Sequence, residues 1–298
     1  MKYYIGVDVG GTNIRVAVVD ERGNMYNVYK EKTTANDIQS LKNQILSLIH
    51  RVDNNQYTIS GVGIGVPGPV KPDGTIIYIP NLHISESFNL KEMLESEIHY
   101  PVFVGNDANV AALAEACVGN GKGCDIVQYV TISTGIGGGL VIHQKMVVGK
   151  NGLAQEIGSM IIRNGGRAPS IYKAKGCIEG EASGTAVVLK AKERGLNVNN
   201  AGDVFILAEQ KNEIAMQIKN EFIKDIAALL GSIVAYMEPD IIVLGGGLMK
   251  SKQYFLADVI KMVDDYVYET LRGKVKIVCA KYDQDCGIIG AAMQALEK

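Results

Sequence analysis

The sequence predicts an α/β protein built from two lobes, and two observations carry this prediction. Apolar runs flank a glycine-rich turn at residues 8–12, and the same strand–turn–strand pattern returns at residues 126–148. A short apolar strand at 101–104 passes directly into an alanine-rich helical stretch at 108–116. Because strands alternate with helices and one hairpin pattern occurs twice, the chain is expected to contain an internal duplication with one copy in each lobe.

The composition is that of an ordinary globular protein, with 298 residues, of which 47% are apolar and 21% charged. A net charge of −2 favours neither nucleic acid nor anionic membrane as a partner. No uninterrupted apolar stretch reaches the about 18 residues of a membrane span, and the first residues do not form a signal peptide. The five cysteines are odd in number and form no CxxC pair, so we expect reduced, mostly buried thiols in a cytoplasmic protein.

The first hairpin is predicted from the apolar runs at 3–7 and 14–19. Glycines at its tip either serve the turn alone or let bare backbone N–H groups approach an anion, with nearby side chains adding donors. In the second case the Asp8 carboxylate stands where it could hold a cation beside a phosphate, directly or through water. The candidate phosphate-binding residues of this hairpin are Gly10, Gly11, Thr12, Asn13 and Arg15.

Between the two hairpins the pattern predicts a helix and two strands. Asp37 can cap a helix whose apolar residues recur at helical spacing through residues 38–52. Residues 59–66 form a glycine-diluted strand, which prolines end in a loop, and residues 75–79 form another strand.

A carboxylate follows the short strand at 101–104, at the switch from strand to helix. Such a position faces the crevice where α/β sheets bind ligands, and this makes Asp107 a candidate catalytic base. The alternative is that Asp107 only caps the helix, a common duty for Asp at this place.

Two further glycine-rich tips follow. Residues 133–136 align with residues 8–11, and two equivalent tips facing one another on two lobes would clamp a polyphosphate from both sides. A third tip, 245–247, follows a long helical pattern at 222–237 and a short strand. Its backbone could lie against a nucleoside, or it could be a tight strand-to-helix turn. The composition break at 119–123 is the predicted crossing between lobes.

Four motifs, in this order and spacing, resemble the ROK family of sugar kinases and repressors. They are Asp8–Thr12 (DVGGT), Gly105–Asp107 (GND), Thr134–Gly139 (TGIGGG) and Leu244–Gly247 (LGGG). The resemblance covers nearly the whole chain. It implies an actin-like ATPase fold of the hexokinase type, ribonuclease H-like, in which two lobes, each on a mixed five-stranded sheet, close over a central cleft. It implies a small lobe of residues 1–117 plus 285–298, to which the C-terminal helix returns, and a large lobe of residues 118–284.

The resemblance also implies roles for single residues. Asp107 corresponds to the general base that takes the proton of the sugar's 6-hydroxyl as this oxygen attacks the γ-phosphorus of ATP. Asp8 corresponds to the residue beside Mg²⁺, which it holds through water. The implied substrate-binding residues are Gly68, Asn81, Asn106, Asp107, Glu156, Ser159 and Glu179. The implied nucleotide-binding residues are Asp8, Gly10, Gly11, Thr12, Asn13, Arg15, Thr134, Gly135, Gly245, Gly246 and Gly247.

These residue types suit the task, because carboxylates and amides bind vicinal hydroxyls in fixed pairs and so tell one epimer from another. For Glu156 and Glu179 the alternative, without the motif, is a solvated surface carboxylate.

The sequence departs from the family at its structural zinc site. The family's GEIGH and CxCGxxGCxE segments read QEIGS at 155–159 and SIYKAKGCIE at 170–179, so three of four ligands are missing. Lone Cys177 cannot build a tetrahedral site, and His50, His83, His99 and His143 show no ligand spacing. We predict no structural zinc. Ser159 is shorter than the family's His and can hydrogen-bond but not bridge sugar and metal, so the family's sugar selectivity is not carried over to this position.

Without the metal, the segment at 160–180 is expected to be a mobile, solvated loop. Its basic residues are Arg163, Arg167, Lys173 and Lys175.

The resemblance implies an ATP- and Mg²⁺-dependent kinase of the 6-hydroxyl of a hexose or N-acylhexosamine, acting as a homodimer. Glucose is the default substrate, with N-acetylmannosamine and allose as competitors. One alternative is a repressor of the family, for whose helix-turn-helix the sequence leaves no room before Asp8. The other is a non-catalytic sugar sensor, against which the presence of Asp8 and Asp107 argues.

Overall fold

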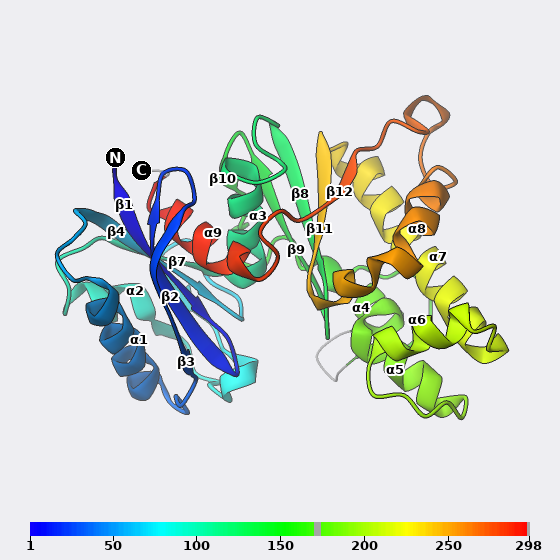
Figure 1. The fold of residues 1–298 in the computed structure, drawn as a ribbon, viewed down its shortest axis with the longest axis horizontal. Coiled ribbons are helices and arrows are strands. Elements are labelled where there is room, and N and C mark those ends of the chain that lie inside the picture. Colours follow the sequence, from blue (N-terminus) through cyan, green and yellow to red (C-terminus); the bar gives the residue numbers. More distant parts are fainter. Residues whose placement is uncertain (170–173, 297–298) are drawn as a thin grey trace. The chain divides into compact units, whose positions relative to one another are not determined.

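The computed structural model describes residues 1–169 and 174–296, and the chain forms two compact units. Unit 1 comprises Met1–Tyr129, Gly139–Gln155 and Ala280–Lys298, and unit 2 comprises Val130–Gly138 and Glu156–Cys279. The described strands form two five-stranded sheets, of order β3-β2-β1-β4-β7 and β10-β9-β8-β11-β12, and a two-stranded sheet (Figure 1). Two α/β lobes on five-stranded sheets are thereby confirmed. The predicted lobe boundaries stay a prediction.

The first sheet is mixed. β1 pairs antiparallel with β2 and parallel with β4, and β4 pairs parallel with β7. The carboxyl ends of the three parallel strands therefore meet at one edge of the sheet. The strands are β1 (Tyr3–Val9), β2 (Asn13–Asp20), β3 (Met25–Lys32), β4 (Ile59–Val66) and β7 (Val102–Asn106).

Helices pack on this sheet. α1 (Ile38–Val52) begins at the predicted cap Asp37, whose side chain accepts the Ser40 N–H, and it buries its apolar stripe. α9 (Cys286–Gln294) packs against β1, β4 and α3 (Asp107–Cys117), so the predicted return of the C-terminal helix to the first lobe is confirmed (Figure 1). A Cβ at Gly290 would overlap the Val110 carbonyl, which shows how closely α9 approaches α3.

The connections in unit 1 are short. They are β5 (Thr75–Ile76), η1 (Pro80–Leu82), β6 (Phe88–Asn89), α2 (Leu90–Glu95) and η5 (Asp283–Asp285). The strand expected at 75–79 is thus wrong in length. The Ile77 N–H donates to the Pro69 carbonyl and the Ile79 N–H to the Ile84 carbonyl, so the chain leaves the β5–β6 ladder after Ile76.

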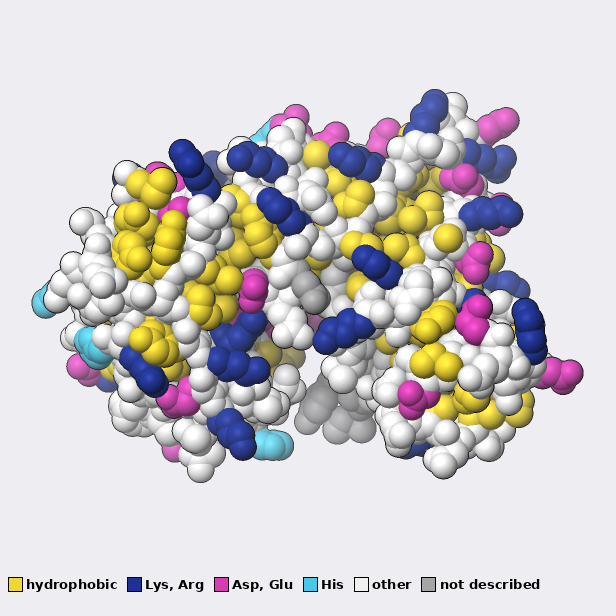
Figure 2. All heavy atoms as spheres, in the orientation of Figure 1, with side chains coloured by type: hydrophobic (Ala, Val, Ile, Leu, Met, Phe, Trp, Pro, Cys, Tyr) yellow, Lys and Arg dark blue, Asp and Glu magenta, His cyan; other side chains and the backbone are white. Residues whose placement is uncertain are grey.

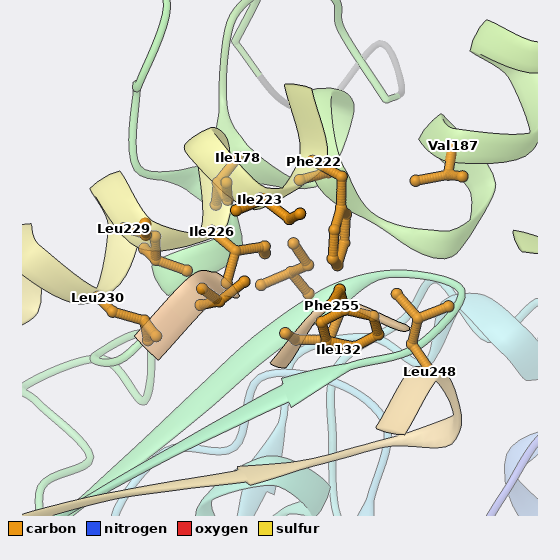
Figure 3. Close-up of a cluster of buried hydrophobic side chains, with 14 of the residues drawn as sticks. Ile132, Ile178, Val187, Phe222, Ile223, Ile226, Leu229, Leu230, Leu248 and Phe255 are labelled. Carbon is orange, nitrogen blue, oxygen red and sulfur yellow. The ribbon is translucent and has the colours of Figure 1, made fainter. Parts of the chain in front are cut away.

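The second sheet comprises β8 (Ile126–Ile132), β9 (Ile136–Ile142), β10 (Lys145–Met146), β11 (Ile241–Gly245) and β12 (Ile277–Cys279). The helices of unit 2 are η2 (Ile157–Ser159), α4 (Ile178–Ala182), α5 (Gly184–Glu193), α6 (Ala201–Glu209), α7 (Glu213–Met237), η3 (Gly247–Tyr254), α8 (Leu256–Val263) and η4 (Glu269–Leu271). Their core centres on Phe205, Phe222 and Phe255, with ring centroids 5.0–5.3 Å apart, and Ile178 of α4 belongs to the same cluster (Figure 3).

Burial and surface charge match most expectations. The five cysteines, all within the described residues, form no disulfide, but only Cys177 and Cys286 are buried, so the expectation of mostly buried thiols was wrong. Acidic and basic side chains are interspersed on the visible face (Figure 2), as the net charge of −2 implies. Among the described residues, no helix has the length and apolar character needed to cross a membrane.

Candidate functional site

The tip of the first hairpin is a closed turn with an exposed end. The Gly10 N–H donates to the Asn13 carbonyl at 2.9 Å, and Thr33 donates its hydroxyl to the Gly10 carbonyl at 2.6 Å. Gly11 and Thr12 are exposed. A Cβ at Gly11 would lie 2.9 Å from the Asn81 Cβ, so the predicted sugar-binding amide on η1 lies against the predicted phosphate tip.

Asp8 lies one residue before the end of β1, beside two positive features. Arg15, its cross-strand neighbour, places Nη2 at 2.7 Å and Nε at 3.2 Å from Asp8 Oδ2. The same guanidinium also reaches Asp285 at 3.1 Å and the Gln284 carbonyl. A Cβ at Gly287 would lie 2.7 Å from Asp8 Cγ, so the first turn of α9 closely approaches this carboxylate. Arg15 therefore holds Asp8 in place, and its predicted contact with nucleotide stays a prediction.

The strand-to-helix switch is organised by Asn106. Its Oδ1 accepts the Ala108 N–H at 3.0 Å and the Asn109 N–H at 3.2 Å, so Asn106 is the N-cap of α3. Its Nδ2 donates to the Gly68 carbonyl at 3.1 Å and ties the proline-rich loop to the helix. Asp107 is the first residue of α3; it is exposed and accepts the Ala108 N–H at 2.8 Å. Helix capping, the alternative role for Asp107, is therefore chiefly the work of Asn106.

The candidate site residues of unit 1 lie at one edge of the first sheet. Asp8 pairs with Gly65 across β1 and β4, and Gly65 pairs with Gly105 across β4 and β7. Asp8 and the turn at Asn106 therefore stand two strands apart at the carboxyl ends of parallel strands, the edge where such sheets bind ligands.

In unit 2 the tip of the second hairpin meets Glu179. The Ile136 N–H donates to Glu179 Oε2 at 2.9 Å, and a Cβ at Gly135 would lie 2.6 Å from the same oxygen. The Ser133 carbonyl accepts the Gly184 N–H at 2.8 Å, and the Thr134 carbonyl accepts a further N–H from the start of α5. Glu179 is half-buried in the first turn of α4, so it is not the solvated surface carboxylate of the alternative reading.

Glu156 and Ser159 share one turn. Both are exposed, and the Ser159 N–H donates to the Glu156 carbonyl at 2.9 Å in η2. The residue before them, Gln155, has φ +66°, a left-handed conformation that glycine adopts without strain. The buried Gln128 amide donates to Gln155 Oε1 at 3.0 Å and stabilises this conformation. Sequence reasoning missed this role, although Gln at a position that is Gly in the resembling motif was a usable signal.

The third glycine tip packs against the base of the second hairpin. Gly246 has φ +92°, and a Cβ there would lie 2.5 Å from the Ile132 carbonyl oxygen and 2.6 Å from Thr131 Oγ1. A Cβ at Gly247 would lie 3.4 Å from Ser133 Oγ. The tip passes into the 3₁₀ helix η3. The strand-to-helix turn, one of the two predictions for this tip, is therefore present, with a 3₁₀ helix in place of the wider α-helix. The second and third tips are thus neighbours within unit 2.

The segment expected to be solvated is held by ion pairs. Arg163 Nη2 lies 2.9 Å from Asp225 Oδ1, and Arg167 Nη1 lies 2.9 Å from Glu193 Oε1. The expectation of merely solvated side chains is therefore wrong for both arginines, whose partners lie 26 or more residues away along the chain. Lys175 is exposed as expected. Ser170, Tyr172 and Lys173 lie outside the described residues.

Within residues 1–169 and 174–296, no cluster of three or more His, Cys, Asp or Glu side chains could hold a metal ion. The absence of zinc stays a prediction.

Two α/β units, glycine-rich hairpin tips and a carboxylate at a strand-to-helix switch match the features that the resemblance to the ROK family implies. A family model described as "ROK family" matches residues 4–298. The chain is 30% identical to a glucokinase of Halalkalibacterium halodurans, over 97% of this chain and 93% of that one. It is 29% identical to an N-acetyl-D-glucosamine kinase of Haemophilus influenzae, over 99% and 100% of the two chains.

A solved structure extends the likeness to three dimensions. The crystal structure of a ROK family glucokinase from Streptomyces griseus in complex with glucose and AMPPNP matches with a TM-score of 0.79 and 28% identity, over 99% of this chain and 100% of that one. The chain belongs to the ROK family, and it is a sugar kinase of that family.

Proposed function

We propose that this protein transfers the γ-phosphate of ATP to the 6-hydroxyl of a hexose or an N-acylhexosamine. The observation that carries the proposal is the placement of Asp107, exposed at the first residue of α3, while Asn106 caps the helix and binds the Gly68 loop. A carboxylate at this exposed position can take a proton from a substrate hydroxyl.

In the proposed reaction the sugar oxygen attacks the γ-phosphorus, its proton passes to Asp107, and ADP leaves. Such transfers depend mainly on positioning and on neutralisation of phosphate charge. The tips around Gly10, Gly135 and Gly246 would hold the nucleotide through backbone N–H groups. AMPPNP in the S. griseus relative supports ATP as the donor.

Asp8 fits a role beside Mg²⁺. This ion keeps several waters in its shell and needs only one or two carboxylates besides the substrate phosphates. Asp8 offers one carboxylate, whose Oδ2 is taken by Arg15. The ion, when bound, would neutralise phosphate charge, and Arg15 would hold Asp8 in one orientation.

The sugar hydroxyls are assigned to the residues that the resemblance to the family indicates. The residues proposed are Gly68, Asn81, Asn106, Asp107, Glu156, Ser159 and Glu179. The relatives act on glucose and N-acetyl-D-glucosamine according to their names, which supports the hexose and N-acylhexosamine classes. Glucose is the first candidate, and N-acetylmannosamine and allose compete with it. A homodimer in the cytoplasm is part of the same proposal.

The test is a panel of hexoses and N-acylhexosamines with ATP and Mg²⁺, followed by coupled ADP release and by the mass of the sugar product. We expect at least one sugar to gain a phosphate. Calorimetric titration with each sugar alone separates the alternative, a non-catalytic sensor, which would bind a sugar and phosphorylate none. That result would refute the proposed kinase activity.

A further inference from the structure

A cluster of buried charges lies in unit 2 around Lys190. Its Nζ lies 3.3 Å from Glu181 Oε2, 3.4 Å from Glu221 Oε2 and 3.7 Å from Asp225 Oδ2. The side chains of Lys190 and Glu181 are 3% and 1% exposed. Since Lys190 belongs to α5, Glu181 to α4 and the other two carboxylates to α7, one ammonium group joins three helices.

The same cluster contacts the segment 163–167, which follows η2. Arg163 reaches Asp225 at 2.9 Å and Glu181 at 3.7 Å, and the backbone N–H of Arg167 donates to Glu181 Oε1 at 2.6 Å. The Arg163 N–H also donates to the Gly176 carbonyl at 3.1 Å. Both Glu181 oxygens are therefore engaged, one by the returning backbone and the other by basic side chains.

The short helix α4 depends on such contacts. It has five residues, and a helix of this length has almost no stability of its own, so tertiary contacts set its orientation. Ile178 anchors it in the core cluster (Figure 3), but an apolar contact is non-directional. The directional contacts of α4 include the Ile178 N–H on the Met160 carbonyl at 2.9 Å. They also include the carboxylates of Glu179 on the Ile136 N–H and of Glu181 on Lys190 and Arg167.

We propose that Glu181 and Lys190 are positioning residues for sugar binding. Their ion pair orients α4, so that Glu179, two residues away on the same helix, keeps its carboxylate on the Ile136 N–H and available to the sugar. This inference rests on the proposed role of Glu179 in sugar binding. Neither Glu181 nor Lys190 is assigned a chemical step.

If the ion pair orients α4, a double variant that lacks both charges should recover what each single variant loses. Lys190→Met alone leaves the buried Glu181 carboxylate without its nearest cation, whereas the double variant removes that charge as well. In both variants Asp225 keeps Arg163 at 2.9 Å and Glu221 keeps Arg194 at 2.7 Å. Lys190→Met keeps most of the aliphatic stem and removes the ammonium group. Glu181→Gln keeps an oxygen for the Arg167 N–H and removes the charge, so it also serves as a milder single variant if Lys190→Met fails to fold.

The matched control is Lys219→Met. Lys219 lies on α7 of the same unit and pairs at 2.8 Å with Glu209, whose side chain is 53% exposed. Loss of this surface pair is expected to leave α4 unchanged.

The experiment combines hydrogen exchange at the Ile136, Arg163 and Arg167 amides with the KM and kcat of the best sugar. For each charged-pair single variant we expect faster exchange at these amides. We also expect a sugar KM higher by on the order of ten- to a hundredfold, with kcat changed far less. The double variant is expected to regain most of both losses, and Lys219→Met to show neither.

Two results would overturn the inference. If the double variant is no better than the single variants, packing rather than charge pairing holds α4. If exchange quickens while the sugar KM stays unchanged, the pair has no influence on Glu179. Failure of the wild type to phosphorylate any sugar would instead count against the proposed function. Calorimetric sugar affinity then replaces KM, and the exchange data still decide whether the pair orients α4.

Discussion

The two glycine-tipped hairpins share a backbone plan but obtain their carboxylates differently. In the first, Asp8 lies on the strand itself and its partner Arg15 is its cross-strand neighbour. In the second, the aligned residue is Ser133, and the carboxylate is Glu179 of α4, which binds the Ile136 N–H at 2.9 Å. The first hairpin therefore carries its own charge, whereas the second depends on a separate helix.

Because of this difference, substitutions in the two units are expected to affect different properties of the protein. The site residues of unit 1 are fixed by sheet register and by the cap of α3, both of which are local or ladder interactions. In unit 2 Glu179 depends on α4, whose Glu181 contacts Lys190 and the Arg167 N–H. A change at Asp107 in unit 1 should therefore act mainly on the chemical step, and changes around α4 should affect sugar affinity.

The largest effect is expected for Asp107→Asn. Asparagine keeps the size of the side chain and an oxygen for the Ala108 N–H, but it cannot accept the hydroxyl proton. We expect kcat to fall by roughly 10²–10⁴ with little change in sugar affinity. Steady-state kinetics and calorimetry measure the two quantities. If this variant turned over as fast as the wild type, Asp107 would have no role in the chemical step, and the assigned difference between the units would be wrong.

Glu179→Gln is expected to act on affinity instead. The amide oxygen can still accept the Ile136 N–H, so the hairpin tip is kept, but charge-assisted bonds to sugar hydroxyls are lost. Because such bonds contribute about 1.5–3 kcal/mol, the sugar KM should rise by roughly one to two orders of magnitude. A fall in kcat with unchanged KM would contradict the division between the units. Glu179→Ala, which also removes the acceptor of the Ile136 N–H, should additionally lower thermal stability.

Arg15→Met tests whether the Asp8 carboxylate depends on the guanidinium group of its own hairpin. The side chains of Arg15 and Asp8 are 18% and 21% exposed, so loss of the guanidinium leaves a partly buried carboxylate beside α9. We expect the free energy of unfolding to fall by roughly 1–3 kcal/mol in urea denaturation. The exposed Arg22, changed to Met, is the control and should have little effect. Equal losses for the two variants would show that Asp8 needs no partner.

The smallest effect concerns pH, and its sign differs between two buried carboxylates. Burial alone would raise the pKa of Asp20 in unit 1, but hydrogen bonds from Asn24, Arg22 and Tyr26 outweigh it and lower this pKa below 3.8. Burial raises the pKa of Asp225 in unit 2 above 3.8, although Lys190 and Arg163 oppose it. The folded state therefore favours the ionised form of Asp20 and disfavours that of Asp225.

Because protonation is linked to folding, these pKa shifts make the free energy of unfolding change with pH in opposite directions. Stability from Asp20 is present above pH 3.8 and is lost as pH falls through its folded pKa. Stability linked to Asp225 is present below pH 3.8 and is lost as pH rises through its folded pKa. The stability difference between wild type and Asp20→Asn should thus grow with rising pH in the acid range. The difference for Asp225→Asn should shrink above pH 3.8. If the stability differences of the two variants from the wild type changed with pH in the same direction, this account would be contradicted.

Local patterns in the sequence predicted the elements that local physics determines. The first hairpin, the helix capped by Asp37 and the strand at 59–66 have strong periodicity and recognisable end signals, and all three are present. The strand at 75–79 was predicted too long. The Ile77 N–H donates to the Pro69 carbonyl, and a pattern of apolar residues does not reveal this competing acceptor.

The parts of the site that sequence could not give are contacts between distant residues. Glu179 and Ile136 are 43 residues apart, and Gly68 and Asn106 are 38 apart. Lys190 and Glu181 carry no motif, and only the fold reveals that their charges are buried together. The resemblance to a family indicated which residues matter, but it did not indicate what holds them.

The most direct test of the central proposal compares glucose with 6-deoxyglucose, or the corresponding pair for whichever sugar the panel selects, in the presence of ATP and Mg²⁺. Phosphorus and carbon NMR of the product locate the new phosphate ester. We expect phosphate on the oxygen at carbon 6 and no ATP-dependent product from the 6-deoxy sugar. Phosphate on another oxygen, or undiminished phosphorylation of the 6-deoxy sugar, would contradict the proposed reaction.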